Sequence, residues 1–283
     1  RSGTTMLRLM LNAHPMISIP FETDFLHFDS RAESYGDLAR RANRVRLIRD
    51  MARYPFIQKA GLIDDVDAAA DQPAGSFADV VANLFSRHAR HHGKIIWGDK
   101  TPSFVTELHR LHELFPHCRI VHIVRDGRDV ALSLSKISWG SPHILRVAED
   151  WRWKTILGHK VGRALGPAYH QVSYERLVME TKSTLCGICD FLGIDFADEM
   201  LDYAETARGQ MPADSLRWHQ SSVSSPDPHK VFMWKKAMKR GHRILFDEHA
   251  GDALDLFGYD RYQGPSTLSS KFLGLYYSVV KRW

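Results

Sequence analysis

The sequence predicts an α/β fold in which a parallel sheet is flanked by helices and carries helical cap insertions. Three short apolar runs, at residues 94–100, 119–126 and 169–175, each end in charged residues, and a helical pattern follows each of them. Such runs, alternating with helices, are typical of parallel strands that are buried on both faces and carry functional loops at their carboxyl ends. We therefore expect the chemistry to lie where these strands end.

Length and composition fit one soluble domain over residues 1–283. The chain is 44% hydrophobic and 25% charged, and no apolar run reaches the roughly 18 residues that a membrane-spanning helix needs. Its 3 cysteines cannot form a disulfide framework, which favours a reducing compartment and a cytoplasmic location. Because the chain opens at Arg1 in what reads as a loop entering a helix, we expect an N-terminal strand to be missing from this sequence.

Periodicity predicts the remaining elements. Residues 4–13 are apolar on most faces and predict a buried helix, which His14-Pro15 ends. We expect a helical insertion over 30–93, which contains an exposed helix to Arg53, a linker at 71–76 and a helix over 77–91. The Ser-, Pro- and His-rich residues 214–230 predict a loop or lid, and a last helix is expected over about 243–256.

Charge indicates an anionic small ligand. The net charge of +5 is a mild excess that suits such a ligand, and the basic run at 235–243 lacks the aromatic residues that nucleic-acid binding favours.

Cys186 and Cys189 form a C-x-x-C pattern without a second pair, so we expect core residues and no metal. The tail at 272–283 has two interpretations, packing on the domain, which we favour, and contact with a membrane surface.

One motif, formed by Arg1, Ser2, Gly3, Thr4 and Thr5, leads directly into the first helix. The glycine lets backbone N–H groups approach an anion, and the threonine hydroxyls lie beside the positive end of the helix dipole. The motif resembles a P-loop, but no Lys follows the glycine, which disfavours hydrolysis of a nucleoside triphosphate. The structural alternative is a simple N-terminal cap.

A second motif predicts a strand that ends at Arg125, a tight turn, and a helix that carries Ser133. The guanidinium of Arg125 has the paired donors that suit a phosphate, and the Ser133 hydroxyl would share the same anion. Two such motifs indicate a ligand with two separated phosphate-type groups. The alternative is that Arg125 forms a structural ion pair with Asp126 or Asp129.

The combination of motifs resembles a known family. RSGTT before a helix, AHP followed by ET, DKTP, and RDGRDVALS are similar to the sulfotransferases that use 3′-phosphoadenosine 5′-phosphosulfate (PAPS). The spacing is most similar to the tyrosylprotein sulfotransferases and the bacterial group related to them. The resemblance covers residues 1–192, and the pairing of the first and last motifs is specific. It implies a P-loop-like parallel sheet, PAPS as co-substrate and no metal.

The resemblance also assigns residues to PAPS. Residues 1–5 would bind the 5′-phosphosulfate, and Arg125 with Ser133 would bind the 3′-phosphate. Tyr174 matches a family tyrosine near the nucleotide, although a core aromatic at a strand end is an equal alternative. Contacts near the C-terminus are harder to align; the candidates are Ser221, Ser222, Lys230 and Lys235.

Two residues are candidates for catalysis. Glu22 stands where the tyrosylprotein branch keeps a catalytic carboxylate, and an acceptor hydroxyl must lose its proton as it attacks sulfur. Its alternative role is to cap the following helix, and Asp24 is the rival base. Lys100, in GDKTP, follows a predicted strand, where its ammonium would neutralise charge on the leaving phosphate oxygen or on the transferred group.

We therefore expect a PAPS-dependent sulfotransferase that moves a sulfuryl group to an acceptor hydroxyl and releases 3′,5′-phosphoadenosine. Two alternatives remain, a P-loop nucleotide kinase and a noncatalytic nucleotide-binding module. The kinase needs a Lys after the glycine and acidic Mg²⁺ ligands, whereas the strand here ends in Arg125. The acceptor, whether a sugar, a lipid, a peptide tyrosine or a small molecule, is not specified by these motifs, and neither is the oligomeric state.

Overall fold

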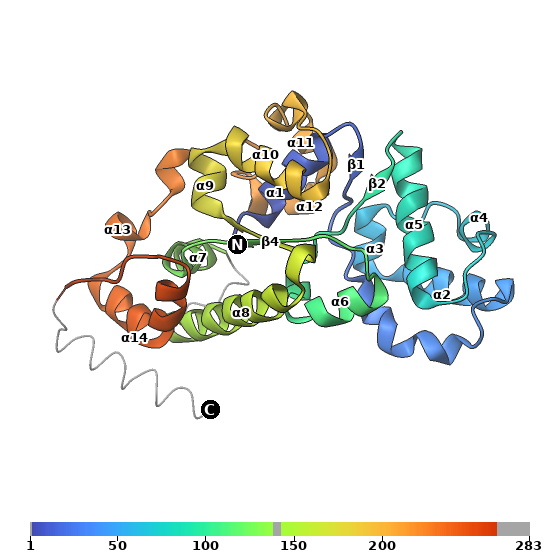
Figure 1. Cartoon of the computed structure of the whole chain (residues 1–283), viewed down its shortest axis with the longest axis horizontal. Helices are drawn as coiled ribbons and strands as arrows, with labels where there is room; N and C mark the ends of the chain where they lie inside the picture. The colour runs from blue at the N-terminus through green and yellow to red at the C-terminus, as the bar shows by residue number, and fades with distance from the viewer. Residues whose placement is uncertain (1, 138–142, 265–283) are drawn as a thin grey trace.

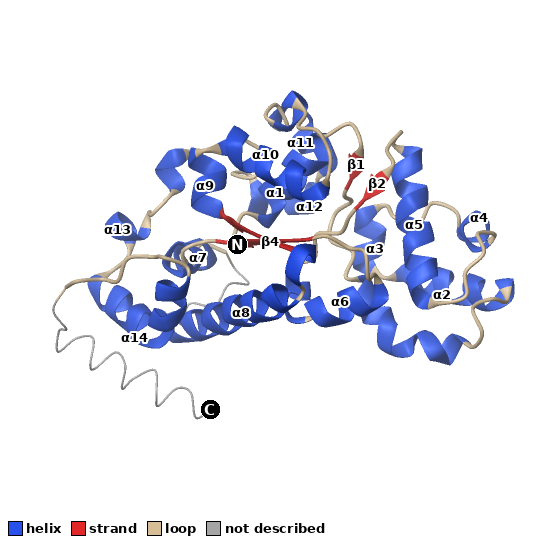
Figure 2. Cartoon of the chain, in the orientation of Figure 1, coloured by secondary structure: helices blue, strands red, loops and turns tan. Residues whose placement is uncertain are grey.

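The computed structural model describes residues 2–137 and 143–264, as helices gathered around short parallel strands (Figures 1 and 2). Its strands are β1 (Ile17–Ser18), β2 (Ile96–Trp97), β3 (Ile120–Val124) and β4 (Tyr169–Ser173). Its helices are α1 (Thr4–Ala13), α2 (Arg41–Arg53), α3 (Pro55–Ala60), α4 (Val66–Ala70), α5 (Phe77–His91), α6 (Leu108–Leu114), α7 (Gly127–Leu134), α8 (Ile144–Ala164), α9 (Tyr174–Met179), α10 (Thr181–Leu192), α11 (Ala204–Ala207), α12 (Ala213–His219), α13 (Trp234–Ala237) and α14 (Arg240–Leu256). Short 3₁₀ helices are η1 (Phe25–Tyr35), η2 (Pro102–Thr106), η3 (Gly166–Ala168), η4 (Asp198–Met200), η5 (Arg208–Gln210) and η6 (Pro228–Lys230).

The expected parallel strands are present, but among the described residues they form two separate pairs. β1 pairs with β2, and β3 pairs with β4 in register from Ile120↔Tyr169 to Val124↔Ser173. β1, which we did not predict, is short because Pro20 has no N–H to continue the ladder. The run at 94–100 likewise contributes only two strand residues. The chain is thus a helix-rich α/β fold rather than one broad sheet.

β3 separates two hydrophobic cores. Ile123 belongs to the larger core, which α1, α5, α9 and α10 also line, while Val124 belongs to a second core with α7, α8 and α14. Successive residues of a strand point to opposite faces, which explains the division. In Figure 1, α1 and α9 to α12 lie on one side of β4, and α7, α8 and α14 lie on the other.

The segment 30–93 is helical, as expected, but differs in detail. The single exposed helix predicted up to Arg53 is divided into η1 and α2, because the chain turns at Gly36, whose φ of 81° favours glycine. The helix predicted over 77–91 is confirmed as α5, and Ser76 and Asp79 form a capping box at its start. Tyr54 joins α2 directly to α3.

The segment 214–230 is not the long loop that we expected. Helix α12 covers its first part and η6 its end. Between them Val223 is buried, and the Tyr203 hydroxyl donates to the Ser224 carbonyl at 2.5 Å. The Ser- and Pro-rich composition misled the prediction because both prolines of the segment, Pro226 and Pro228, lie after α12 and do not interrupt it. The last helix, α14, begins at Arg240 rather than 243.

Within residues 2–137 and 143–264, no helix combines the length and the apolar character needed to cross a bilayer. The tail at 272–283, for which we weighed a membrane contact, lies outside the described residues.

Candidate active site

The carboxyl ends of β1 and β2 bring Glu22 and Lys100 together. The Lys100 Nζ donates a short hydrogen bond to Glu22 Oε1 and lies 3.5 Å from the Thr5 hydroxyl. Only 11% of the Lys100 side chain and 23% of the Glu22 side chain are exposed. Burial lowers the pKa of Lys100, while Glu22 raises it. The two residues predicted for catalysis are therefore one ion pair, beside the start of α1.

Glu22 does not cap the helix that follows it. The N-cap position of η1 belongs to Asp24, and no side chain caps it. Asp24, the rival base, has a left-handed φ of 49° and accepts a hydrogen bond at 2.7 Å from the Tyr54 hydroxyl. Asp24 thus engages the helical segment 30–93, whereas Glu22 engages Lys100.

Sequence reasoning missed Arg8, which lies one turn after Thr5 on α1. Arg8 is buried and donates to the carbonyl of Ile19 at 3.1 Å and to that of Gln210 at 3.1 Å. Burial lowers its pKa to about 10, an effect that the nearby Glu22 opposes. A lone arginine in an otherwise apolar helix was the signal that would have revealed it.

The N-terminus of α1 has the geometry of an anion-binding turn. Gly3 is the N-cap with φ 90°, and neither a side-chain cap nor an acidic residue satisfies the first turn. Ser2 and Thr4 are half-buried there, and Thr5 is buried. Arg1 lies outside the described residues, so its assigned role stays a prediction.

The second motif places Arg125 against Tyr174. The guanidinium lies 4.2 Å from the centroid of the Tyr174 ring and donates at 2.8 Å to the Lys230 carbonyl. It also forms the ion pair that we weighed against ligand binding, at 3.4 Å to Asp129. The Arg125 Nε is buried without a hydrogen-bond partner in the described part of the chain. Ser133 lies near the end of α7.

Tyr174 connects the two motifs. A Cβ added to Gly3 would lie 2.4 Å from Tyr174 Cδ2, so the glycine backbone packs directly on the ring that Arg125 covers. Burial raises the pKa of Tyr174, while Arg125 lowers it. Tyr174 is thus buried like a core aromatic and still lies between the two predicted anion sites.

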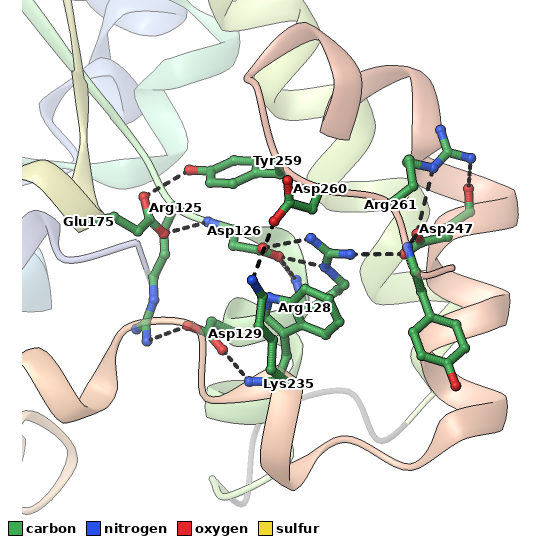
Figure 3. Close-up of polar contacts among 12 residues, drawn as sticks. Arg125, Asp126, Arg128, Asp129, Glu175, Lys235, Asp247, Tyr259, Asp260 and Arg261 are labelled. Carbon is green, nitrogen blue, oxygen red and sulfur yellow. Dashed lines mark hydrogen bonds and ion pairs between the residues drawn. The ribbon is translucent and has the colours of Figure 1, made fainter. Parts of the chain in front are cut away.

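A buried charge network supports the turn after Arg125 (Figure 3). Arg128, whose side chain is 0% exposed, donates to both carboxylate oxygens of Asp126, at 2.9 and 2.8 Å, and contacts Asp247 at 3.3 Å. Asp126 also caps α7, and its N–H donates to Glu175 at 3.0 Å. The fully buried ion pair of this motif therefore belongs to Arg128, while the Arg125 guanidinium lies over the Tyr174 ring.

The remaining predicted residues are placed as follows. Lys230 and Lys235 pair with Asp227 at 3.7 Å and Asp260 at 3.3 Å, respectively. Cys186 and Cys189 lie on α10, half-buried and buried. The part of the chain that the structure describes holds no group of three or more His, Cys, Asp or Glu side chains arranged for a metal.

Gly3→Ala is expected to reduce the free energy of unfolding by about 1 to 3 kcal/mol, because alanine disfavours a φ of 90° and its Cβ would clash with Tyr174. Urea unfolding measures the loss. Gly61→Ala is the matched control, since Gly61 has φ 61° but open space around a Cβ. An equal loss in both variants would show that the Tyr174 contact contributes nothing.

Comparison with known proteins identifies the family of the chain. The sequence model of the sulfotransferase family matches residues 1–198. Protein-tyrosine sulfotransferase 2 of Gallus gallus is 25% identical over 277 residues, which are 94% of this chain and 68% of that protein. An uncharacterized protein of Aquifex aeolicus is 24% identical over 223 residues, which are 74% of this chain but only 26% of that protein.

A solved structure has the same fold. The sulfotransferase domain of the Synechococcus PCC 7002 olefin synthase superposes with a TM-score of 0.63 and 25% identity, over 92% of this chain and 91% of that domain. The family model, over residues 1–198, spans both motifs. This chain therefore belongs to the sulfotransferase family.

Proposed function

We propose that this chain transfers a sulfuryl group from PAPS to an acceptor hydroxyl and releases 3′,5′-phosphoadenosine. The observation that carries the proposal is the position of Lys100, which contacts Glu22 on one side and Thr5 on the other. Glu22 would contact the acceptor hydroxyl, and Lys100 would contact the donor. Family membership supports the reaction class.

The site residues would divide the reaction between them. The acceptor oxygen forms a bond to sulfur while the bond from sulfur to the 5′-phosphate oxygen breaks, so charge develops on the departing oxygen. The acceptor proton passes to the Glu22 carboxylate. Lys100 and the N–H groups at the start of α1 stabilise the charge on the departing phosphate.

Lys100 would also couple donor binding to proton transfer. In the structure its ammonium is engaged by Glu22. The 5′-phosphosulfate, bound at Gly3 to Thr5, offers the ammonium a second anionic partner. A shift of Lys100 toward the donor frees the Glu22 carboxylate for the acceptor proton, so the base becomes available when PAPS is in place.

Arg125 and Ser133 would bind the 3′-phosphate, with Tyr174 beside the nucleotide. Arg125→Ala is expected to weaken binding of 3′,5′-phosphoadenosine by about 2 kcal/mol or more, because a charge-assisted hydrogen bond is lost. Calorimetry measures the change. Equal affinity of the parent protein for ATP and PAPS would contradict the proposal, since ATP lacks the 3′-phosphate.

Arg119→Ala is the matched control for Arg125. Arg119 flanks the other end of β3, where it lies 5.4 Å from the Phe191 ring centroid and donates to the Phe191 carbonyl at 2.9 Å. Its replacement removes an arginine with the same kinds of contact, so donor affinity should stay unchanged.

The acceptor is a hydroxyl compound whose class a direct screen would identify. The name of the Gallus gallus relative refers to protein tyrosine, so tyrosine peptides belong in the screen beside sugars, lipids and small phenols. Labelled PAPS and detection of the sulfated product test the proposal. A parent protein that binds PAPS and sulfates none of them would favour the noncatalytic alternative. A cytoplasmic location and the absence of nucleic-acid or metal partners remain predictions.

A further inference from the structure

The loops that carry Glu22 and Lys100 continue side by side after their strands end. β1 and β2 pair over two residues, and Gly98 then donates from its backbone N–H to the Ser18 carbonyl at 3.0 Å. Beyond Gly98, hydrogen bonds that involve side chains join the two loops. A pairing this short cannot by itself fix two catalytic side chains several residues further on.

A buried hydrogen bond lies beside the catalytic pair. The Thr23 hydroxyl donates to Asp99 Oδ1 at 2.6 Å, and Thr23 is 0% exposed. Thr23 directly follows Glu22, and Asp99 directly precedes Lys100. The bond therefore joins the two loops at the residues adjacent to the ion pair.

A second contact joins the same loops one position further on. The Asp24 backbone N–H donates to the Thr101 hydroxyl at 3.2 Å, and the Tyr54 hydroxyl holds the Asp24 carboxylate from outside. Hydrogen bonds between neighbouring groups in a low-dielectric site strengthen one another. The relative position of the two loops is thus set by side-chain contacts.

Asp99 is an unfavourable residue to bury for stability alone. Its Oδ2 is buried without a hydrogen-bond partner in the described residues, and burial raises its pKa to about 6, against the effects of Thr23, Thr101 and Lys100. Leaving a carboxylate oxygen unsatisfied costs free energy. Burial of Asp99 does not favour the folded state, yet Asp99 contacts Thr23 in the loop that carries Glu22. This combination fits a positioning role.

We propose that Thr23 and Asp99 form a positioning pair, which fixes the loop of Glu22 beside the loop of Lys100, so that the Lys100 ammonium reaches both the Glu22 carboxylate and the donor bound at the start of α1. Neither residue touches the reacting atoms; both act through their neighbours. The inference rests on the proposed sulfuryl transfer for its consequence, but the arrangement itself can be measured without any substrate.

Thr23→Val tests the pair, because valine has nearly the same shape and lacks the hydroxyl. We expect kcat to fall by roughly 10- to 100-fold, while the Kd for 3′,5′-phosphoadenosine stays within about twofold of the parent value. Thr23→Ser, which keeps the hydroxyl, should restore most of kcat. Thr184→Val is the matched control, since the Thr184 hydroxyl is buried and has no hydrogen-bond partner within residues 2–137 and 143–264, and kcat should not change.

The double variant distinguishes a shared role from two separate ones. If Thr23 and Asp99 act as one unit, Thr23→Val combined with Asp99→Ala lowers kcat no further than the more damaging single change. Three results would overturn the inference. They are a double variant in which the fold-losses of kcat from the two single changes multiply, a Thr23→Ser variant as slow as Thr23→Val, and an unchanged kcat in Thr23→Val. If Thr23→Val does not unfold cooperatively, Asp99→Ala replaces it. The inference then predicts a kcat about 10- to 100-fold lower in Asp99→Ala and near the parent value in Thr23→Ser, and an unchanged kcat in Asp99→Ala overturns it.

A substrate-free measurement keeps this inference separate from the proposed function. In protein labelled with ¹³C at lysine Cε, the Lys100 signal is identified by its loss in Lys100→Arg. Thr23→Val should move the pH titration of that signal toward the one seen in Glu22→Gln, and an unmoved titration rejects the positioning pair. A parent protein that turns over no PAPS would instead reject sulfuryl transfer, whatever the Lys100 signal does.

Discussion

Glu22→Gln is expected to reduce turnover by roughly 10² to 10⁴ while PAPS affinity stays near that of the parent protein. Glutamine keeps the shape of the side chain and can still accept a hydrogen bond from Lys100, but it cannot take the acceptor proton. Single-turnover kinetics with labelled PAPS, together with calorimetry of the desulfated product, separate the chemical step from binding.

Asp24→Asn is the control for Glu22→Gln. Asp24 lies two residues away and its carboxylate engages Tyr54, so its replacement should have a mild effect on turnover. If Asp24→Asn abolished turnover while Glu22→Gln stayed active, the base would be Asp24 and our assignment wrong. If Glu22→Gln lowered only the melting temperature, a structural role for Glu22 would explain its position better than a catalytic one.

The parts of the site that sequence reasoning identified lie at strand ends and at the start of α1. Those positions follow from local rules: a glycine before a helix, and charged residues that end an apolar run. Thr5 and Lys100 were singled out for such reasons, and Glu22 from the resemblance to the tyrosylprotein branch; the structure places Lys100 in contact with both of the others. Their mutual distances depend on strand pairing, which no local pattern specifies.

The contacts that position the site could not be predicted in the same way. Thr23 and Asp99 lie 76 positions apart in the chain, and a threonine next to a glutamate has no signature of its own. The same limit applies to the turn after Arg125. Two arginines lie three residues apart there, and the second buried partner of Arg128, Asp247, is brought to it by the packing of α7 against α14, which no local pattern specifies.

The fold itself was predicted in class rather than in detail. Parallel strands and helix α5 are present, but the strand pairs are shorter and the helices more numerous than the periodicity indicated. Pro20 limits β1 by removing a donor, and Pro212 begins a helix where we expected a loop. Proline ends an element where a backbone N–H is needed and is tolerated at the start of a helix, where it is not.

Arg128→Met is expected to reduce the free energy of unfolding by about 3 to 5 kcal/mol, because it leaves the Asp126 carboxylate buried without its cation and leaves Asp247 paired with Arg261 alone, at 3.5 Å. The Trp234 ring, 3.5 Å from the guanidinium, loses its cationic partner as well. Urea unfolding measures the loss. Arg176→Ala, at an exposed pair with Glu180, is the control and should change stability by less than about 0.5 kcal/mol.

A second variant separates the lost charge from the lost packing. In Arg128→Met combined with Asp126→Asn, the uncompensated carboxylate of Asp126 is removed, so part of the stability should return. Because Asp126 also caps α7 through the N–H of Arg128 at 2.9 Å, and asparagine caps equally well, the recovery reports the buried charge alone. If the double variant were no more stable than Arg128→Met, the loss would come from packing around Trp234, and the ion pairs would contribute little to the turn that carries Arg125.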